Sequence, residues 1–149
     1  MEVRSIPMEE LYPLLAEQLR HGSARLPVTG SSMSPTLRGG RDLVRLERPD
    51  RAARRGDILL YRRENGQYVL HRCLRREGAH LVCCGDRQLE KETIREDQVL
   101  AVVTALCRKG TWYKTTHWSC RLYTRLWMLL PLRRAAFFAR GVLRRLGWK

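Results

Sequence analysis

Between residues 26 and 109 the chain is a series of short apolar segments separated by turn residues, and this pattern limits the fold more than any other feature. Six segments are rich in Val, Leu and Ile: LPVT, DLVRLE, DILLYRR, QYVLHRCLRR, HLVCC and QVLAVVTALCRK. Asn65-Gly66 and Glu77-Gly78, which separate three of them, are typical of hairpin turns. Segments of this length and spacing predict a small, mostly antiparallel β-sheet or barrel of five or six strands.

A helix is predicted before this β region. Apolar residues at positions 8, 11, 15 and 19 repeat at helical spacing over residues 5–22. Ser5 is the expected cap and Gly22 the expected stop, while Pro13 predicts a kink or a late start.

Two amphipathic helices are predicted after Gly110, the first ending at Pro131 and the second covering residues 132–147. In the second helix most arginines fall on one arc and most apolar side chains on the other. The expected organisation has three parts: an N-terminal helix (1–25), a β core (26–108) and a basic amphipathic tail (111–149).

Charge is distributed unevenly along the chain. Its 149 residues include 29 Lys and Arg and 15 Asp and Glu, for a net charge of +14. Eleven basic residues and no acidic residue lie in 98–149. A near-neutral body with a basic tail argues against a fold devoted to nucleic acid and indicates a local anionic partner for the tail.

Two placements of this tail fit the sequence. It lies on an anionic membrane surface, or its apolar arc packs on the core or a partner subunit; nucleic acid fits less well. No apolar run approaches the roughly 18 residues of a membrane span, and no secretory signal is evident. We therefore expect a cytoplasmic protein, at the inner face of the membrane if the tail binds lipid.

The five cysteines show no zinc-site spacing, since Cys83 and Cys84 are adjacent and the others stand alone. We expect reduced, mostly buried thiols, with no metal and no cofactor.

Three positions carry groups suited to acyl transfer. Ser32 lies in the Gly-, Ser- and Pro-rich segment TGSSMSPTL, where a turn between two strands can expose a hydroxyl. A serine hydroxyl needs a base, which His71 on a predicted strand can supply. Asp86 follows another strand at a turn, where a carboxylate can orient an imidazole. The alternative without catalysis is that Ser32 only forms the turn and that His71 is an ordinary half-buried histidine of a strand.

Four segments, taken in order, resemble a known family. SMSPTL, GDILLY, HR and GD are similar to boxes of the type I signal peptidase and LexA-like serine peptidases, over roughly residues 26–105. The similarity is greatest to the signal peptidase branch whose base is histidine. It implies a coiled, antiparallel, barrel-like β core and cleavage after small residues of a peptide extended beside a strand.

The resemblance assigns a role to each matching residue. Ser32 is the expected nucleophile, His71 the base and Asp86 the acidic residue, whereas Gly56-Asp57 is expected to shape the turn into the next strand. Many lysine-type relatives have a serine two residues before the nucleophile as oxyanion donor. Gly30 stands there, so the Ser32 N–H is the expected donor.

Other differences from the family leave alternatives. Arg87 follows Asp86 where relatives commonly have Asn, so Asp97 is a second candidate for the acidic role. Similarly, Arg41 precedes Asp42 where a glycine is usual. Lys91 is a less suitable base than His71, because its acidic neighbours favour the charged ammonium.

The expected function is a serine endopeptidase that cleaves a precursor or leader peptide through an acyl-enzyme. A non-catalytic membrane- or peptide-binding relative is one alternative. A self-cleaving LexA-like regulator is another, but the roughly 25 residues before the core are too few for a helix-turn-helix domain. The expected partner is a peptide or precursor-protein substrate.

Overall fold

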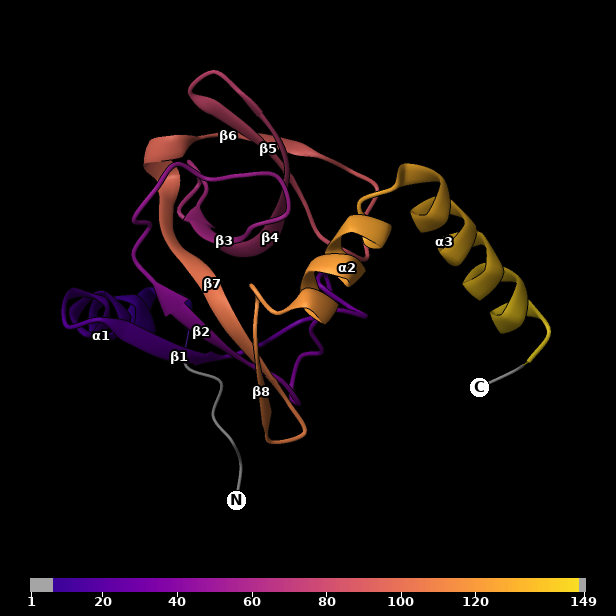
Figure 1. The fold of residues 1–149 in the computed structure, drawn as a ribbon, viewed down its shortest axis with the longest axis horizontal. Helices are drawn as coiled ribbons and strands as arrows, with labels where there is room; N and C mark the ends of the chain where they lie inside the picture. Colours follow the sequence, from indigo (N-terminus) through magenta and orange to yellow (C-terminus); the bar gives the residue numbers. More distant parts are fainter. Residues whose placement is uncertain (1–6, 148–149) are drawn as a thin grey trace. The chain divides into compact units, whose positions relative to one another are not determined.

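The computed structural model describes residues 7–147, without the side chains of 130–134 and 136 (Figure 1). In this part of the chain there are three helices and eight strands. The helices are α1 (Met8–Arg20), α2 (Trp118–Trp127) and α3 (Leu130–Arg145). The strands are β1 (Ser23–Pro27), β2 (Leu43–Glu47), β3 (Ile58–Arg62), β4 (Tyr68–Glu77), β5 (His80–Cys84), β6 (Glu92–Arg95), β7 (Val99–Arg108) and β8 (Thr111–Lys114), with a 3-10 turn, η1 (Glu96–Gln98), before β7.

The strands form one antiparallel sheet in the order β1-β2-β7-β3-β4-β5-β6. β7 is long enough to pair with β3 through its first residues and with β8 through its last. No pairing joins β1 to β6 among the described strands, so the sheet is open and the expected barrel-like core is not confirmed. The mainly β class with helical ends is confirmed.

Both predicted hairpin turns are present. Arg63 and Gln67 close the β3–β4 turn with a main-chain hydrogen bond of 2.7 Å, and Gly66 adopts a φ of 88°. Gly78 has a φ of 62° between β4 and β5. Glycine takes up these left-handed conformations without steric cost, which explains why the turns fall at these residues.

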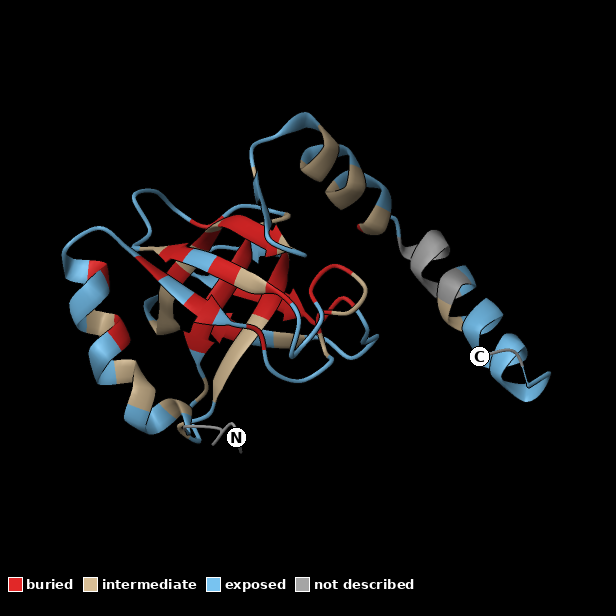
Figure 2. Cartoon of the chain, turned by 90° about the horizontal axis from the view of Figure 1, so that it is seen from below, coloured by how far each residue is buried: buried red, intermediate tan, exposed pale blue. Residues whose placement is uncertain are grey.

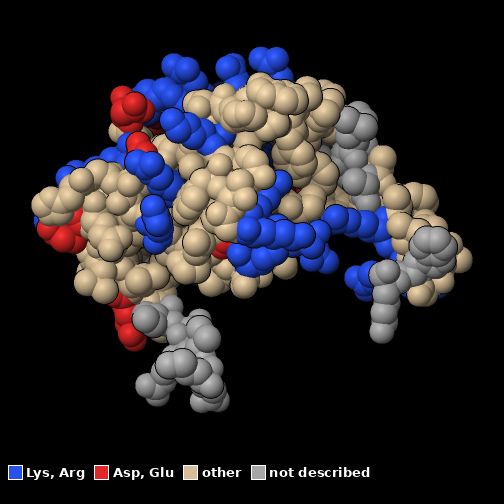
Figure 3. Space-filling view, turned by 60° about the horizontal axis from the view of Figure 1, so that its bottom comes forward, with Lys and Arg blue, Asp and Glu red and all other residues tan. Residues whose placement is uncertain are grey.

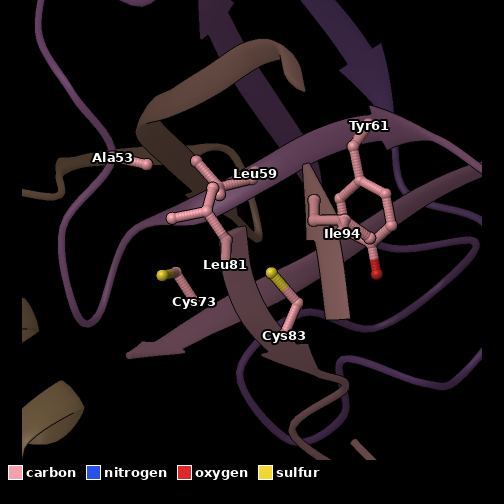
Figure 4. Close-up of a cluster of buried hydrophobic side chains, with 7 residues drawn as sticks. All are labelled: Ala53, Leu59, Tyr61, Cys73, Leu81, Cys83 and Ile94. Carbon is pink, nitrogen blue, oxygen red and sulfur yellow. The ribbon is translucent and has the colours of Figure 1, made fainter. Parts of the chain in front are cut away.

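The buried side chains concentrate in the sheet, whereas the helices are largely exposed (Figure 2). One buried cluster draws on β3, β4, β5 and β6 together with the loop before β3 (Figure 4). Its members are Ala53, Leu59, Tyr61, Cys73, Leu81, Cys83 and Ile94. All five cysteines are free and four are buried, as expected, while Cys120 is half-buried.

Strands β6 and β8 extend the sheet beyond the six predicted segments. β6 arises from a polar stretch in which only Ile94 is buried, and every residue of β8 is exposed. β6 therefore lacks the apolar content by which strands are recognised, whereas β8, which contains Trp112 and Tyr113, is too short to show a pattern. β8 also means that residues 111–114 belong to the sheet and not to a helical tail.

The helices differ from prediction mainly at their ends. α1 begins at Met8 and continues through Pro13, with Leu15 and Leu19 buried, whereas the predicted Ser5 cap lies outside the described residues. Pro131 does not end a helix but stands in the first turn of α3, where a missing N–H costs nothing. The chain forms two compact units, residues 1–115 and 116–149, so α1 shares a unit with the sheet.

Candidate active site

The Ser32 turn joins β1 to β2 and is anchored in the core on both sides of the serine. Val28 before the serine and Met33 and Leu37 after it are buried, while Ser32 is partly exposed. At its base Val28 donates to the Asp42 carbonyl at 2.9 Å, and Gly40 donates to the Val28 carbonyl at 3.0 Å. The turn is thus a closed loop that holds Ser32 near the surface on a buried support.

Asp42 is buried and holds the end of this loop. Its carboxylate accepts hydrogen bonds from the Arg38 N–H at 2.8 Å and from the Arg41 guanidinium at 2.5 and 2.8 Å. Burial alone would raise the pKa of Asp42, but these hydrogen bonds and the nearby positive charge of Arg41 lower it overall. The Arg41 that departs from the family pattern is therefore a partner of Asp42.

A second turn, after β5, lies against the Ser32 turn. The Arg87 N–H donates to the Ser32 carbonyl at 2.8 Å, and Thr36 Oγ1 donates to the Asp86 carboxylate. A Cβ atom on Gly85 would come within 2.6 Å of the Ser32 carbonyl oxygen. Only glycine lets the two main chains approach this closely, so the Gly-Asp segment is a structural support of the Ser32 turn.

Asp86 is fully buried and paired with Arg72. The Arg72 Nε and Nη2 atoms donate to its two oxygens at 2.8 and 2.7 Å. Asp97, the alternative acidic residue, is exposed and hydrogen-bonded to Arg95. Among the described residues, the side-chain hydrogen bonds of these two carboxylates go to Arg72, Thr36 and Arg95, and none goes to His71.

The carboxylate that contacts His71 is that of Glu92. His71 Nδ1 lies 3.2 Å from Glu92 Oε1 and 3.2 Å from the Tyr61 hydroxyl, and that hydroxyl donates to Glu92. The Arg63 guanidinium donates a hydrogen bond of 2.8 Å to each of the two Glu92 carboxylate oxygens. Among the described residues no hydrogen bond engages Nε2, the other ring nitrogen.

Strand register explains why Glu92 reaches His71. Side chains alternate between the two faces of a sheet, so His71 and Cys73 share a face of β4. Cys73 pairs with Cys83 on β5, and Cys83 pairs with Glu92 on β6. Glu92 therefore projects from the same face as His71, whereas Arg72 projects from the other face, toward Asp86.

The pKa of His71 is lowered below its ordinary value of about 6.5. Burial is the main cause, and it outweighs the nearby charge of Glu92, which acts in the opposite direction. Burial also raises the pKa of Glu92, but hydrogen bonds from Arg63 and Tyr61 lower it overall. The pKa of Tyr61 is raised, mainly by burial and then by its bond to Glu92. At neutral pH this leaves a neutral imidazole beside a carboxylate and a protonated phenol.

Gly56-Asp57 shapes the turn into β3, as expected. Gly56 has a φ of 96°, and its N–H donates to the Cys73 carbonyl at 2.8 Å. The Asp57 carboxylate accepts from the Arg54 N–H at 2.8 Å and from the Arg51 guanidinium. Lys91, the disfavoured alternative base, is exposed.

The Ser32 turn lies against the residues that follow β5, and His71 lies near the start of β4, the strand that pairs with β5. Arg72, next to His71, pairs across the sheet with Cys84, and Gly85 directly after it lies against the Ser32 carbonyl. His71 is thus next in sequence to the residue that pairs with Cys84, and among the described residues no hydrogen bond joins His71 to Ser32.

No protein-family model and no curated protein sequence matches this chain. In the described part of the chain, no cluster of His, Cys, Asp and Glu side chains is arranged to hold a metal ion. None of the described helices has the length and apolar composition to cross a bilayer.

Proposed function

We propose that the protein is a serine peptidase in which Ser32 is the nucleophile, His71 the general base and Glu92 the carboxylate that orients the base. The contact of His71 Nδ1 with Glu92 is the observation that carries this proposal. A neutral imidazole that donates its Nδ1–H to a carboxylate has a lone pair on Nε2, as a general base requires.

The proposed reaction follows acyl-transfer chemistry. Nε2 of His71 accepts the Ser32 Oγ proton while Oγ attacks the scissile carbonyl carbon. The resulting oxyanion accepts a hydrogen bond from the Ser32 N–H, and the imidazolium then protonates the leaving amine. Water then gives a proton to His71 while its oxygen attacks the acyl carbon. The bond between Ser32 Oγ and the acyl carbon breaks, the imidazolium returns the proton to Oγ, and the acyl group leaves as a carboxylic acid. Glu92 stays ionised and stabilises the imidazolium, and Arg63 helps because it keeps the pKa of Glu92 low.

The substrate proposed from the family resemblance is an extended precursor or leader peptide cleaved after a small residue. The open antiparallel sheet, with the Ser32 turn between β1 and β2, is compatible with the signal peptidase-like core that the resemblance implies. The test is incubation of the purified chain with a peptide library, followed by mass spectrometry of the new termini.

Cleavage after small residues is the expected result. Peptide retention without any cleavage would contradict catalysis and identify a non-catalytic peptide-binding relative. Release of fragments of the chain itself, with no peptide cleaved, would indicate a self-cleaving regulator instead.

Glu92→Gln is expected to lower kcat by about 10²- to 10⁴-fold, because an amide can hold the wrong tautomer of His71 and cannot stabilise the imidazolium. It should also move the acid limb of the pH profile to lower pH, since the Glu92 charge raises the pKa of His71. In the wild type this limb should already lie below pH of about 6.5. Initial rates measured across a pH series report both changes.

The control for this variant is Glu90→Gln, which removes an exposed carboxylate two residues away and should leave both kcat and the acid limb unchanged. If Glu92→Gln lowered kcat without moving the acid limb, Glu92 would be structural and not an orienting group for His71.

A further inference from the structure

The second compact unit, residues 116–149, exposes apolar side chains that form a stripe along α2. Trp118, Leu122 and Leu126 follow one another at intervals of four residues and so share one helical face. They are 70, 49 and 50% exposed. Leu129, just beyond the helix, is 49% exposed. Large apolar residues in a continuous exposed row indicate a surface that another molecule covers.

Arginines accompany this stripe. Arg121 and Arg125 follow Trp118 and Leu122 by three residues, so they lie about 60° around the helix from these side chains, and both are exposed. The exposed face of α2 therefore carries a row of apolar side chains with a row of guanidinium groups along its edge.

The helix α3 also exposes both apolar side chains and arginines. Phe138, Val142 and Leu146 are spaced four residues apart, and each is exposed, Phe138 to 75%. Arg140 and Arg144, also exposed, lie around the opposite side of the helix, whereas the exposed Arg145 lies beside the apolar row. Each of the two helices thus combines an uncovered apolar face with arginines.

The charge of residues 116–149 indicates which kind of molecule covers these faces. Residues 116–149 contain eight basic residues and no acidic residue. Lys and Arg side chains also occupy far more of the face drawn in Figure 3 than Asp and Glu do. A second copy of this unit would bring eight further positive charges against these eight. Nucleic acid would match the charge but leave the apolar rows in water.

We propose that α2 and α3 bind the surface of a bilayer that contains anionic lipid. The apolar rows enter the boundary between headgroups and acyl chains, where burial of apolar area is favourable. The arginines remain at the level of the lipid phosphates and donate hydrogen bonds to them. This binding uses no residue of the proposed peptidase site, so a negative result for one proposal does not affect the other.

The test is co-sedimentation of the full chain with vesicles of phosphatidylcholine alone and of phosphatidylcholine mixed with phosphatidylglycerol. Binding is expected only to the mixed vesicles, and it should weaken as salt is raised. Trp118 provides a second readout, because its fluorescence should shift to shorter wavelength with the mixed vesicles and Trp118→Phe should remove most of that shift.

Two double variants separate the charged from the apolar contribution. Arg121→Gln with Arg125→Gln should weaken binding to the mixed vesicles by about 30-fold, if each charge contributes its usual amount near an anionic surface. Leu122→Ser with Leu126→Ser should weaken it by at least about tenfold.

Matched controls come from the first unit. Leu14 and Leu89 are 67 and 54% exposed, so Leu14→Ser with Leu89→Ser removes a similar exposed apolar area. Arg48 and Arg55 are exposed, and replacing both with Gln removes the same charge. Both control variants should bind the mixed vesicles as the wild type does.

The proposal is overturned by equal binding to neutral vesicles, by no binding, or by binding that both α2 variants leave unchanged. Duplex DNA binding that the arginine variant abolishes, without vesicle binding, would identify nucleic acid as the partner. Self-association that the leucine variant abolishes, again without vesicle binding, would identify a second copy of the chain.

Discussion

Replacing either Ser32 or His71 with Ala is expected to lower kcat by about 10⁶-fold, because nucleophile and base act as a unit and the loss of one disables the other. Substrate binding should change far less than kcat, since neither side chain is needed to hold an extended peptide. Rates of peptide cleavage under single-turnover conditions, with enzyme in excess, give the size of the loss directly.

A second serine and a second histidine provide the controls for these two variants. Ser34→Ala removes a hydroxyl from the same turn, and His80→Ala removes an exposed imidazole from β5. Both should retain most of the activity. A Ser32→Ala protein that cleaves as fast as Ser34→Ala would show that the reaction does not use Ser32.

Asp86→Ala is expected to lower the free energy of unfolding by about 3–5 kcal/mol, since it leaves the buried Arg72 guanidinium without its partner. Arg72→Met combined with Asp86→Ala should destabilise the protein less than the sum of the two single variants, because no charge then stays buried. Urea denaturation followed by circular dichroism measures these changes.

An exposed ion pair supplies the comparison for this effect. Glu77 contacts Arg75 at the surface, and Glu77→Ala should cost no more than about 1 kcal/mol. If Asp86→Ala abolished peptide cleavage while its unfolding free energy matched that of the wild type, Asp86 would belong to the catalytic residues, as the sequence predicted.

The sequence predicted most of the sheet because its central strands are strongly apolar. β3 has four consecutive buried residues, and the Asn-Gly turn after it marks a hairpin without any knowledge of tertiary contacts. β6 was missed because it has one buried residue among four and arises from a charged stretch. Its pairing with β5 is a long-range contact that local periodicity cannot report.

The same limit explains why the sequence did not identify Glu92 as the carboxylate beside His71. Asp86 matches the Gly-Asp motif of the family. That motif does not reveal that Arg72, on the face of β4 opposite His71, points toward Asp86. Glu92 lies 21 positions beyond His71 in the chain and reaches it only through the register of three strands. Given the β4–β5 hairpin and a β6 partner, alternation of faces would have identified Glu92.

The most direct test of the peptidase proposal is the reaction of the protein with a fluorophosphonate, which phosphonylates an activated serine. The wild type should gain one label, and peptide mapping should locate it on Ser32. Labelling should be lost in Ser32→Ala, strongly slowed in His71→Ala and kept in Ser34→Ala. A label that persists in Ser32→Ala, or that maps to Ser31 or Ser34 in the wild type, would contradict the assignment of Ser32 as the nucleophile.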